Sequence, residues 1–223
     1  MTKKLFLQAV CKYLAGVVLL GLLIFLPAGT LRFPNGWLLM ALLFIPMLCA
    51  GVVMMLRDPA LLEKRLKAKE SEGEQKEVIW QSGVLFIAAF VLAGLNFRFG
   101  WLSLPKWIVW TACALFLLAY LMWAEVLREN AFLSRTVELQ EGQTVVDTGL
   151  YGVVRHPMYA ASVLLFLTMP LILGSIFSFL VMLAYLPIIS KRIRNEEELL
   201  KKELPGYGEY MERVKYRLVP YIW

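Results

Sequence analysis

The side chains best suited to chemistry lie in two short segments of this chain. Residues 149–159 read Gly-Leu-Tyr-Gly-Val-Val-Arg-His-Pro-Met-Tyr and hold the only histidine of the protein, His156. Residues 192–197 read Arg-Ile-Arg-Asn-Glu-Glu. The uncharged, apolar residues 160–190 separate the two segments and are long enough to enter a membrane and return. We therefore expect both segments to meet at one membrane surface.

Each segment also has an ordinary structural interpretation. A histidine followed by proline often forms a polar cap where a helix begins, because proline is tolerated at the first helical position. Arg192 and Glu196 are four residues apart and share one face of a helix, so a simple ion pair would account for them. The clustering of tyrosine, arginine and histidine within one short segment favours a functional site.

The composition indicates an all-α integral membrane protein. The chain has 223 residues, of which 60% are hydrophobic, and its mean hydropathy is +0.66, whereas soluble domains are nearer half apolar. We expect a polytopic transmembrane helical bundle of about six spans, with a C-terminal helical hairpin and a cytosolic tail helix that ends at Pro205 and Gly206. The expected spans are residues 13–31, 37–56, 78–97, 106–127, 157–173 and 176–190.

The basic residues predict the orientation. Of the 23 Lys and Arg residues, 20 lie before the first span or in residues 57–77, 128–156 and 191–223. By the positive-inside rule, both termini lie in the cytosol. This topology explains the net charge of +6 without a nucleic-acid partner. Spans nearly free of charge also argue against an ion channel or a proton-coupled transporter.

The chain divides into a four-span membrane region, residues 1–127, and a catalytic region, residues 128–223, made of a cytosolic loop, the hairpin and the tail. Long loops such as residues 128–156 are often functional. We also expect an interfacial helix from about Glu63, followed by a flexible segment at residues 69–74.

The three cysteines indicate neither a disulfide nor a metal site. Cys11, Cys49 and Cys113 lie far apart in apolar runs, without metal-ligand spacing. They are expected to be core thiols.

The two segments resemble motifs of one family. Residues 149–159 resemble the Gly-x-Tyr-x-x-x-Arg-His-Pro-x-Tyr motif of the isoprenylcysteine carboxyl methyltransferase family. The C-terminal signature of that family is matched in the same order by Arg192-x-x-x-Glu196-Glu197-x-x-Leu200, Gly206-Tyr207-x-x-Tyr210 and Val214-x-x-Arg217-Leu-x-Pro220. The resemblance covers about residues 135–223, and the motifs are specific because they occur together. The short N terminus and compact loops resemble a prokaryotic member, which implies the inner membrane of a prokaryote.

This resemblance implies transfer of a methyl group from S-adenosyl-L-methionine (SAM) to a lipophilic acceptor at the cytosolic face. The acceptor implied first is a carboxylate, as in a prenylated cysteine, and the other partners are membrane lipids. Arg192 matches an arginine placed against the substrate, and Arg192 and Glu196 are the candidate catalytic residues. The residues implied to contact SAM are Gln143, Thr144, Val145, Val146, Tyr151, His156, Pro157, Met158, Tyr159, Glu196 and Glu197.

The chemistry of these residue types agrees with those roles. SAM carries a sulfonium and an ammonium, so Glu196 is a suitable partner and the aromatic faces of Tyr151 and Tyr159 offer cation–π contacts. The fork of Arg192 matches a carboxylate. A carboxylate is already a nucleophile, so catalysis would consist mainly of alignment in a dry pocket, and no metal is required.

Three alternatives remain at this stage. Sterol reductases, which use NADPH, share a similar Arg-His-Pro-x-Tyr element and an ending like residues 214–220. They usually carry Asn where Met158 stands, and Arg-Asp with a Cys where Glu196, Glu197 and Leu200 stand. A phospholipid N-methyltransferase would use SAM but would need a path for the amine proton. A non-catalytic scaffold would tolerate alanine at the motif residues.

Overall fold

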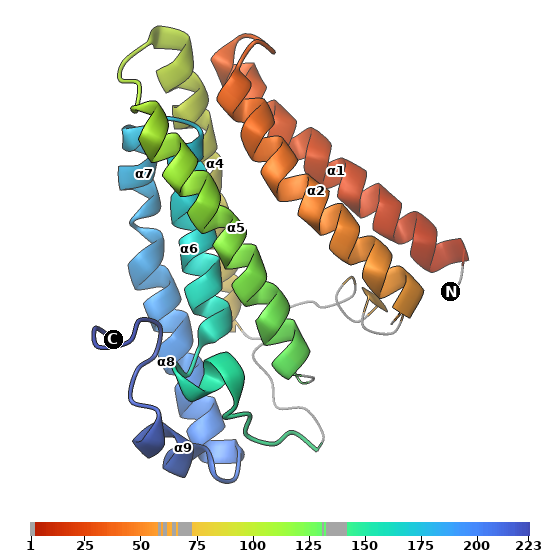
Figure 1. Ribbon diagram of the computed structural model, residues 1–223, viewed down its shortest axis with the longest axis vertical. Helices are drawn as coiled ribbons and strands as arrows, with labels where there is room; N and C mark the ends of the chain where they lie inside the picture. Colours follow the sequence, from red (N-terminus) through yellow and green to blue (C-terminus); the bar gives the residue numbers. More distant parts are fainter. Residues whose placement is uncertain are drawn as a thin grey trace.

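The computed structural model describes residues 3–57, 59, 62, 63, 66, 73–130, 132 and 142–223. Within this part of the chain the regular secondary structure is helical, as the sequence predicts (Figure 1). The helices are α1 (Lys3–Ala28), α2 (Pro34–Arg57), α4 (Gly73–Phe99), α5 (Lys106–Glu129), the 3₁₀ helix η1 (Gly149–Gly152), α6 (Pro157–Ile172), α7 (Ile176–Met182), α8 (Tyr185–Glu203) and α9 (Tyr207–Arg213).

Among the described residues, five helical segments are long and apolar enough to cross a membrane: Lys3–Ala28, Pro34–Arg57, Glu77–Phe99, Lys106–Glu129 and Ile176–Glu203. The remaining expected span, residues 157–173, is the apolar helix α6, which has only 16 residues. At 1.5 Å per residue it is about 24 Å long, shorter than the ~30 Å hydrocarbon layer.

The helical hairpin expected in the C-terminal half is present. Gly174, with a φ of 78°, turns the chain between α6 and α7, and the side chain of Ser175 caps α7 by accepting a hydrogen bond from the Ser178 N–H. After a short interruption α8 continues in the direction of α7 and extends well beyond the expected end of the span (Figure 1). Gly206, with a φ of 82°, then separates α8 from α9, so α8 ends at Glu203, close to the Pro205 and Gly206 at which the sequence predicts the end of a tail helix.

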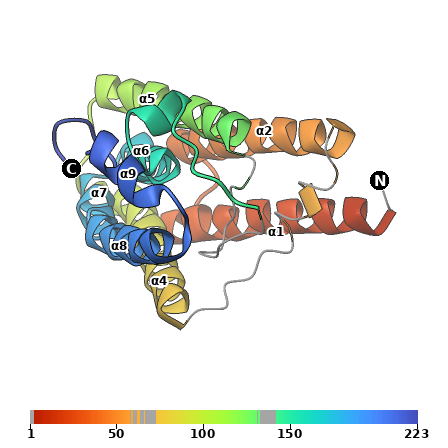
Figure 2. The same cartoon turned by 90° about the horizontal axis from the view of Figure 1, so that it is seen from below.

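One hydrophobic core joins the first four long helices to α6. Its fully buried members include Ile24, Leu39, Phe116 and Ile172. α1 and α4 approach closely at Gly94, where an added Cβ would lie 2.7 Å from the Ile24 carbonyl oxygen. Small residues permit such close backbone approach between membrane helices. Figure 2 shows α1 and α2 extending together to one side of the other helices.

The cysteine prediction is correct only in part. Cys113 is buried in this core, but Cys11 and Cys49 are exposed on α1 and α2. In a membrane helix an outward thiol faces lipid tails, which are as apolar as a protein core. An apolar environment therefore does not require the protein interior.

The expected interfacial helix after Glu63 and the flexible segment at residues 69–74 lie almost wholly outside the described residues.

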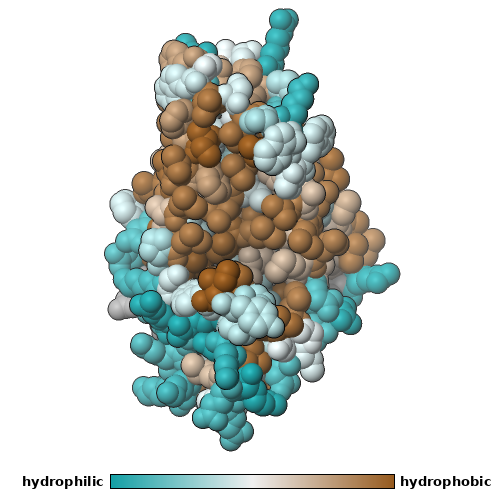
Figure 3. Space-filling model, turned by 60° about the vertical axis from the view of Figure 1, so that its left-hand side comes forward, coloured by the Kyte–Doolittle hydropathy of each residue, from teal (hydrophilic) through white to brown (hydrophobic). Residues whose placement is uncertain are grey.

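The surface separates into an apolar body and a hydrophilic end (Figure 3). We call the latter the polar end; it contains η1, α9 and the last turns of α8 (Figure 1). The two ends of the described chain lie in the half of the molecule that contains the polar end, whereas the turns 29–33, 100–105 and 173–175 lie at the opposite end (Figure 1). This arrangement brings residues 142–156 and the tail together.

Candidate functional site

The loop before α6 is attached to the end of α5. The Thr148 hydroxyl donates a hydrogen bond to Glu129 Oε2 at 2.6 Å, and the Asn130 amide donates one to the Tyr151 hydroxyl at 2.9 Å. Between them Gly149 has a φ of 54°, and a Cβ there would lie 2.9 Å from the Glu129 carboxyl carbon. Glycine at this position therefore allows the loop to rest on α5.

The Arg-His-Pro segment begins α6. His156 is the N-cap residue, and Pro157 occupies the first turn, as expected. Pro157 is fully buried. The His156 ring stacks on Tyr159, with ring centroids 5.7 Å apart. The helix start thus directs both rings toward the polar end, next to α8.

Glu197 lies at the centre of a buried charge cluster. Arg155 Nε donates to Glu197 Oε1 at 2.7 Å, and Arg217 Nε donates to Oε2 at 2.7 Å. His156 Nε2 is 3.1 Å from Oε1. We call these four residues the Glu197 cluster. A buried carboxylate is tolerated only when paired and hydrogen-bonded, so the cluster joins α8, the loop and the tail.

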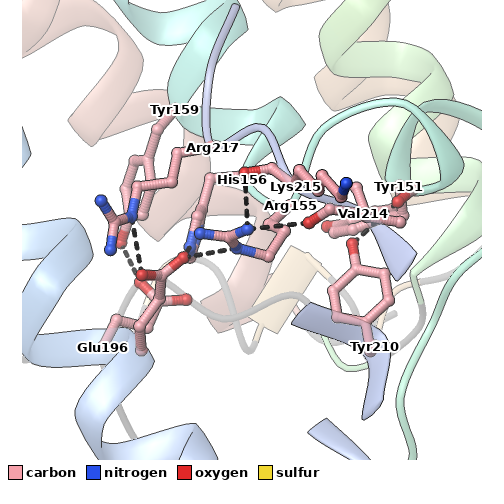
Figure 4. Close-up of polar contacts among 10 residues, drawn as sticks. Tyr151, Arg155, His156, Tyr159, Glu196, Tyr210, Val214, Lys215 and Arg217 are labelled. Atoms are coloured by element: carbon pink, nitrogen blue, oxygen red, sulfur yellow. Dashed lines mark hydrogen bonds and ion pairs between the residues drawn. The ribbon is translucent and has the colours of Figure 1, made fainter. Parts of the chain in front are cut away.

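The tail is bound to the loop through its backbone as well. Arg155 Nη1 donates to the carbonyl oxygens of Val214 and Lys215, at 2.7 and 2.9 Å. The backbone N–H groups of Arg155 and His156 donate to the Tyr216 and Arg217 carbonyls. Figure 4 shows Arg155 reaching the tail on one side of the cluster, with Tyr210 below Tyr151.

The Tyr210 hydroxyl donates to the Tyr151 carbonyl at 2.8 Å. At the surface, Arg213 pairs with Asp147 at 2.8 Å. The loop is therefore held between α5 on one side and α9 on the other.

A second polar chain connects α6 with α8. The Tyr159 hydroxyl donates to Glu196 Oε2 at 2.5 Å and accepts from Arg192 Nε at 2.9 Å. The Arg192 guanidinium also lies over the Tyr159 ring, 5.9 Å from its centroid. Arg192 and Glu196 share a face of α8, as expected, and Tyr159 bridges them.

These elements enclose a cleft of about 850 Å³, counting the space at its open side. The residues assigned to SAM from the sequence that line it are Gln143, Thr144, Val145, Val146, Tyr151, His156, Met158, Tyr159 and Glu196. Three other candidates lie beside the cleft. Pro157 begins α6, Glu197 belongs to its cluster, and Arg192 contacts Tyr159.

Further residues line the cleft without having been assigned to it from the sequence: Asn130, Phe132, Arg155, Leu199, Leu200, Leu204, Tyr207 and Tyr210. Leu200, Tyr207 and Tyr210 belong to the C-terminal signature, so their motif positions could have identified them. No pattern in the sequence singles out Asn130.

The tyrosines of the cleft outside the spans remain neutral. Burial raises the pKa of Tyr151 to about 12, although the hydrogen bond from Asn130 opposes this rise. Burial also raises the pKa of Tyr207 and of Tyr210 well above the usual value. All three therefore keep their hydroxyl proton at physiological pH and present hydrogen-bonding groups and aromatic faces.

Comparisons with known proteins agree with this architecture. The model of the isoprenylcysteine carboxyl methyltransferase family matches residues 96–202. The solved structure of a eukaryotic intramembrane Ras methyltransferase, an isoprenylcysteine carboxyl methyltransferase, has a TM-score of 0.57. The match covers 92% of this chain and 74% of that one, with 19% identity, and shows a shared fold.

A curated relative matches a shorter segment. The delta(14)-sterol reductase of Mus musculus is 29% identical over 91 residues, which are 40% of this chain and 22% of the reductase. The match thus spans about a fifth of the length of that protein.

The fold and the cleft define a polytopic helical membrane protein with a cleft at its polar end. The family model, which covers just under half of the chain, supports the isoprenylcysteine carboxyl methyltransferase family that the motifs resemble, and the solved structure shows the same fold. Family and fold together support a membrane methyltransferase.

Proposed function

We propose that this protein transfers a methyl group from SAM to the carboxylate of a lipophilic acceptor at the cytosolic membrane face. The observation that carries the proposal is the cleft, which is lined by nine of the eleven residues assigned to SAM from the sequence. These residues come from three separate parts of the chain, and the family match covers all three parts.

The side chains around the cleft suit SAM chemically. Glu196 offers a carboxylate for an ammonium. Tyr151, Tyr159 and Tyr207 offer aromatic faces for a cation. Apolar side chains such as Leu199 suit a nucleobase. When bound, SAM would supply an electrophilic methyl group on its sulfonium.

The acceptor would approach from the membrane side. Arg192 is only 8% exposed. It lies next to an apolar cluster that includes Tyr159, Tyr185 and Ile189. A lipid chain could occupy the bilayer while its carboxylate reaches the guanidinium, which binds carboxylates in a bidentate manner. Arg192 and Tyr159 would then orient the acceptor oxygen, and exclusion of water would favour transfer.

The cytosolic orientation is part of the proposal. It rests on the 20 Lys and Arg residues expected on one side against three, Arg32, Arg98 and Lys106, on the other. The polar end holds the cleft, and SAM is water-soluble, so the cleft must face the compartment that contains it.

The test is a titration of the purified protein with SAM in which the unfolding temperature is measured. A ligand stabilises the state that binds it, so binding should raise this temperature. We expect stabilisation of the wild type and a loss of at least about tenfold in affinity in Glu196→Gln, as for a charged hydrogen bond. Glu198→Gln is the matched control, because Glu198 is exposed on the same helix. No response to SAM in any of these proteins would refute the proposal.

A second candidate is an NADPH-dependent reductase, favoured by the match to the sterol reductase over 91 residues. The same titration with NADPH distinguishes the two. Stabilisation by NADPH, with no stabilisation by SAM in the separate titration, would support the reductase. Methylation of an amine lipid, with no transfer to a prenylated carboxylate, would instead indicate an N-methyltransferase.

A further inference from the structure

The tail ends the described chain in a tight turn with exposed apolar side chains. After α9 the chain folds back at residues 217–223 (Figure 1). Val219 is 45% exposed, Tyr221 88% and Ile222 79%. We call residues 219–222, Val-Pro-Tyr-Ile, the tail tip. Large apolar side chains at such exposure are unfavourable in water unless another apolar phase covers them.

The turn is held in one conformation. The Trp223 carbonyl accepts hydrogen bonds from the N–H groups of Arg217, Leu218 and Val219, at 2.9, 2.9 and 3.1 Å. The Trp223 N–H donates back to the Val219 carbonyl at 3.1 Å. Tyr221 has a φ of 65°, which a non-glycine residue keeps only where its surroundings impose it. The backbone of the tail tip is thus fixed by hydrogen bonds, and its side chains point outward.

The turn lies where the protein changes from apolar to charged. Trp223 packs against the cluster that contains Ile189 and Ile193 of α8. Along α8 the sequence passes there from Leu-Pro-Ile-Ile at residues 186–189 to Lys-Arg-Ile-Arg at residues 191–194. In Figure 1 the tail loop lies beside this part of α8.

A second helix marks the same level independently. Lys191 of α8 forms an ion pair with Glu77 of α4 at 3.4 Å. Three residues further along α4, Trp80 is 69% exposed, as is typical of tryptophan at a membrane interface. The level of Lys191 is therefore the boundary between hydrocarbon and headgroups.

We propose that the tail tip is an interfacial anchor, which inserts Tyr221 and Ile222 into the headgroup region of the membrane that the spans cross. The lipid layer is the apolar phase closest to a tip at this level. Tyrosine suits it, because its ring is apolar while its hydroxyl remains hydrated. Lys215 precedes the tip, is exposed and would lie near lipid phosphates.

The anchor would connect the membrane to the site. In the same tail, the Tyr216 and Arg217 carbonyl oxygens accept hydrogen bonds from the backbone N–H groups of Arg155 and His156. Fixing the tip at the membrane surface therefore restrains the segment that begins α6. The proposal requires only the tail and a bilayer, so it stands or falls separately from methyl transfer.

The test is the depth of a fluorophore in bilayers. In a variant whose three cysteines are replaced by alanine, Ile222→Cys carries an environment-sensitive label, and the protein is reconstituted into phosphatidylcholine vesicles. We expect quenching by lipids with a nitroxide high on the acyl chain and loss of quenching by aqueous iodide, since interfacial side chains lie ~5–10 Å deep. Glu209→Cys, exposed on α9, is the control that iodide should reach. Iodide quenching at position 222 equal to that at 209 would overturn the proposal.

A second pair of variants tests the cause of insertion. The label is moved to Val219→Cys and combined with Ile222→Asp or with Ile222→Leu. Asp at the interface should shift the label toward water and raise iodide quenching, whereas Leu should leave it unchanged. Equal lipid quenching in both variants would mean that the apolar tip does not drive insertion, and the anchor would be rejected.

Discussion

Helices α1 and α2 are held in place mainly by apolar contacts, whereas the polar end is held together by hydrogen bonds and ion pairs. In α1 and α2 most contacts are apolar, and side chains such as Leu19 and Leu26 point outward at 61% and 74% exposure. At the polar end, buried charged groups each have defined partners, as in the Glu197 cluster. Apolar contacts are non-directional, whereas hydrogen bonds require one geometry. Recognisable motifs therefore occur at the polar end and are absent from the first two helices.

The largest expected effect comes from the centre of the polar end. Glu197→Gln removes the negative charge that pairs with Arg155 and Arg217 and leaves buried cationic groups uncompensated. We expect a loss of about 3–5 kcal/mol of stability, as for other broken buried ion pairs, measured by thermal or denaturant unfolding in detergent. Glu198→Gln, one residue further along α8, should change stability by less than ~0.5 kcal/mol. Equal stability of both variants would mean that the cluster does not hold the tail.

Gly149→Ala addresses the backbone of the loop rather than its charges. The φ of 54° is unfavourable for alanine, and its Cβ would meet the Glu129 carboxylate. We expect a cost of roughly 1–2 kcal/mol and weaker ligand binding in the cleft. Gly208→Ala is the control, because nothing lies within 4 Å of an added Cβ there, and helical Ala is favourable by about 0.5–1 kcal/mol. Unchanged stability of Gly149→Ala would contradict the geometry of the loop.

Tyr159→Phe tests the bridge between Arg192 and Glu196. It removes one hydroxyl that makes hydrogen bonds at 2.5 and 2.9 Å. We expect stability to fall by about 0.5–1.5 kcal/mol, together with altered SAM affinity, both measured by thermal shift. Tyr185→Phe, in the same apolar cluster, serves as the aromatic control and should be nearly neutral. A neutral Tyr159→Phe would show that the bridge contributes little.

The smallest effect is expected on the outer face of α1. Leu19→Val changes a side chain that is 61% exposed and faces lipid, so stability in bicelles should change by less than ~0.5 kcal/mol. A loss comparable to that of Glu197→Gln would overturn the comparison, because it would assign specific packing to this face.

Hydropathy alone predicts much of the fold. The expected spans are helical, the last of them divided between α7 and α8, because a chain in hydrocarbon must satisfy its backbone hydrogen bonds internally. Hydropathy does not indicate which side of an evenly apolar helix faces the protein. Cys11 and Cys49 were therefore wrongly expected in the core. The division of the chain at residue 127 into a four-span region and a catalytic region stays a prediction.

The sequence identified those residues of the candidate site that belong to the motifs. It did not identify contacts between residues that are far apart in the sequence. The motif residues converge on one cleft, but the sequence assigned both Glu196 and Glu197 to SAM contacts. Neighbours on a helix point about 100° apart, so α8 directs Glu196 to the cleft and Tyr159 and turns Glu197 into the buried cluster.

The amino-acid sequence by itself determined the helices, their order and the residue types at the polar end. These follow from local hydropathy, caps and spacing. Only the tertiary structure decided that Glu197 pairs with Arg155, 42 residues away, that Asn130 reaches Tyr151, and that the tail crosses the start of α6. Such partners depend on how helices pack side by side, and packing is a property of the whole fold that no single stretch of sequence encodes.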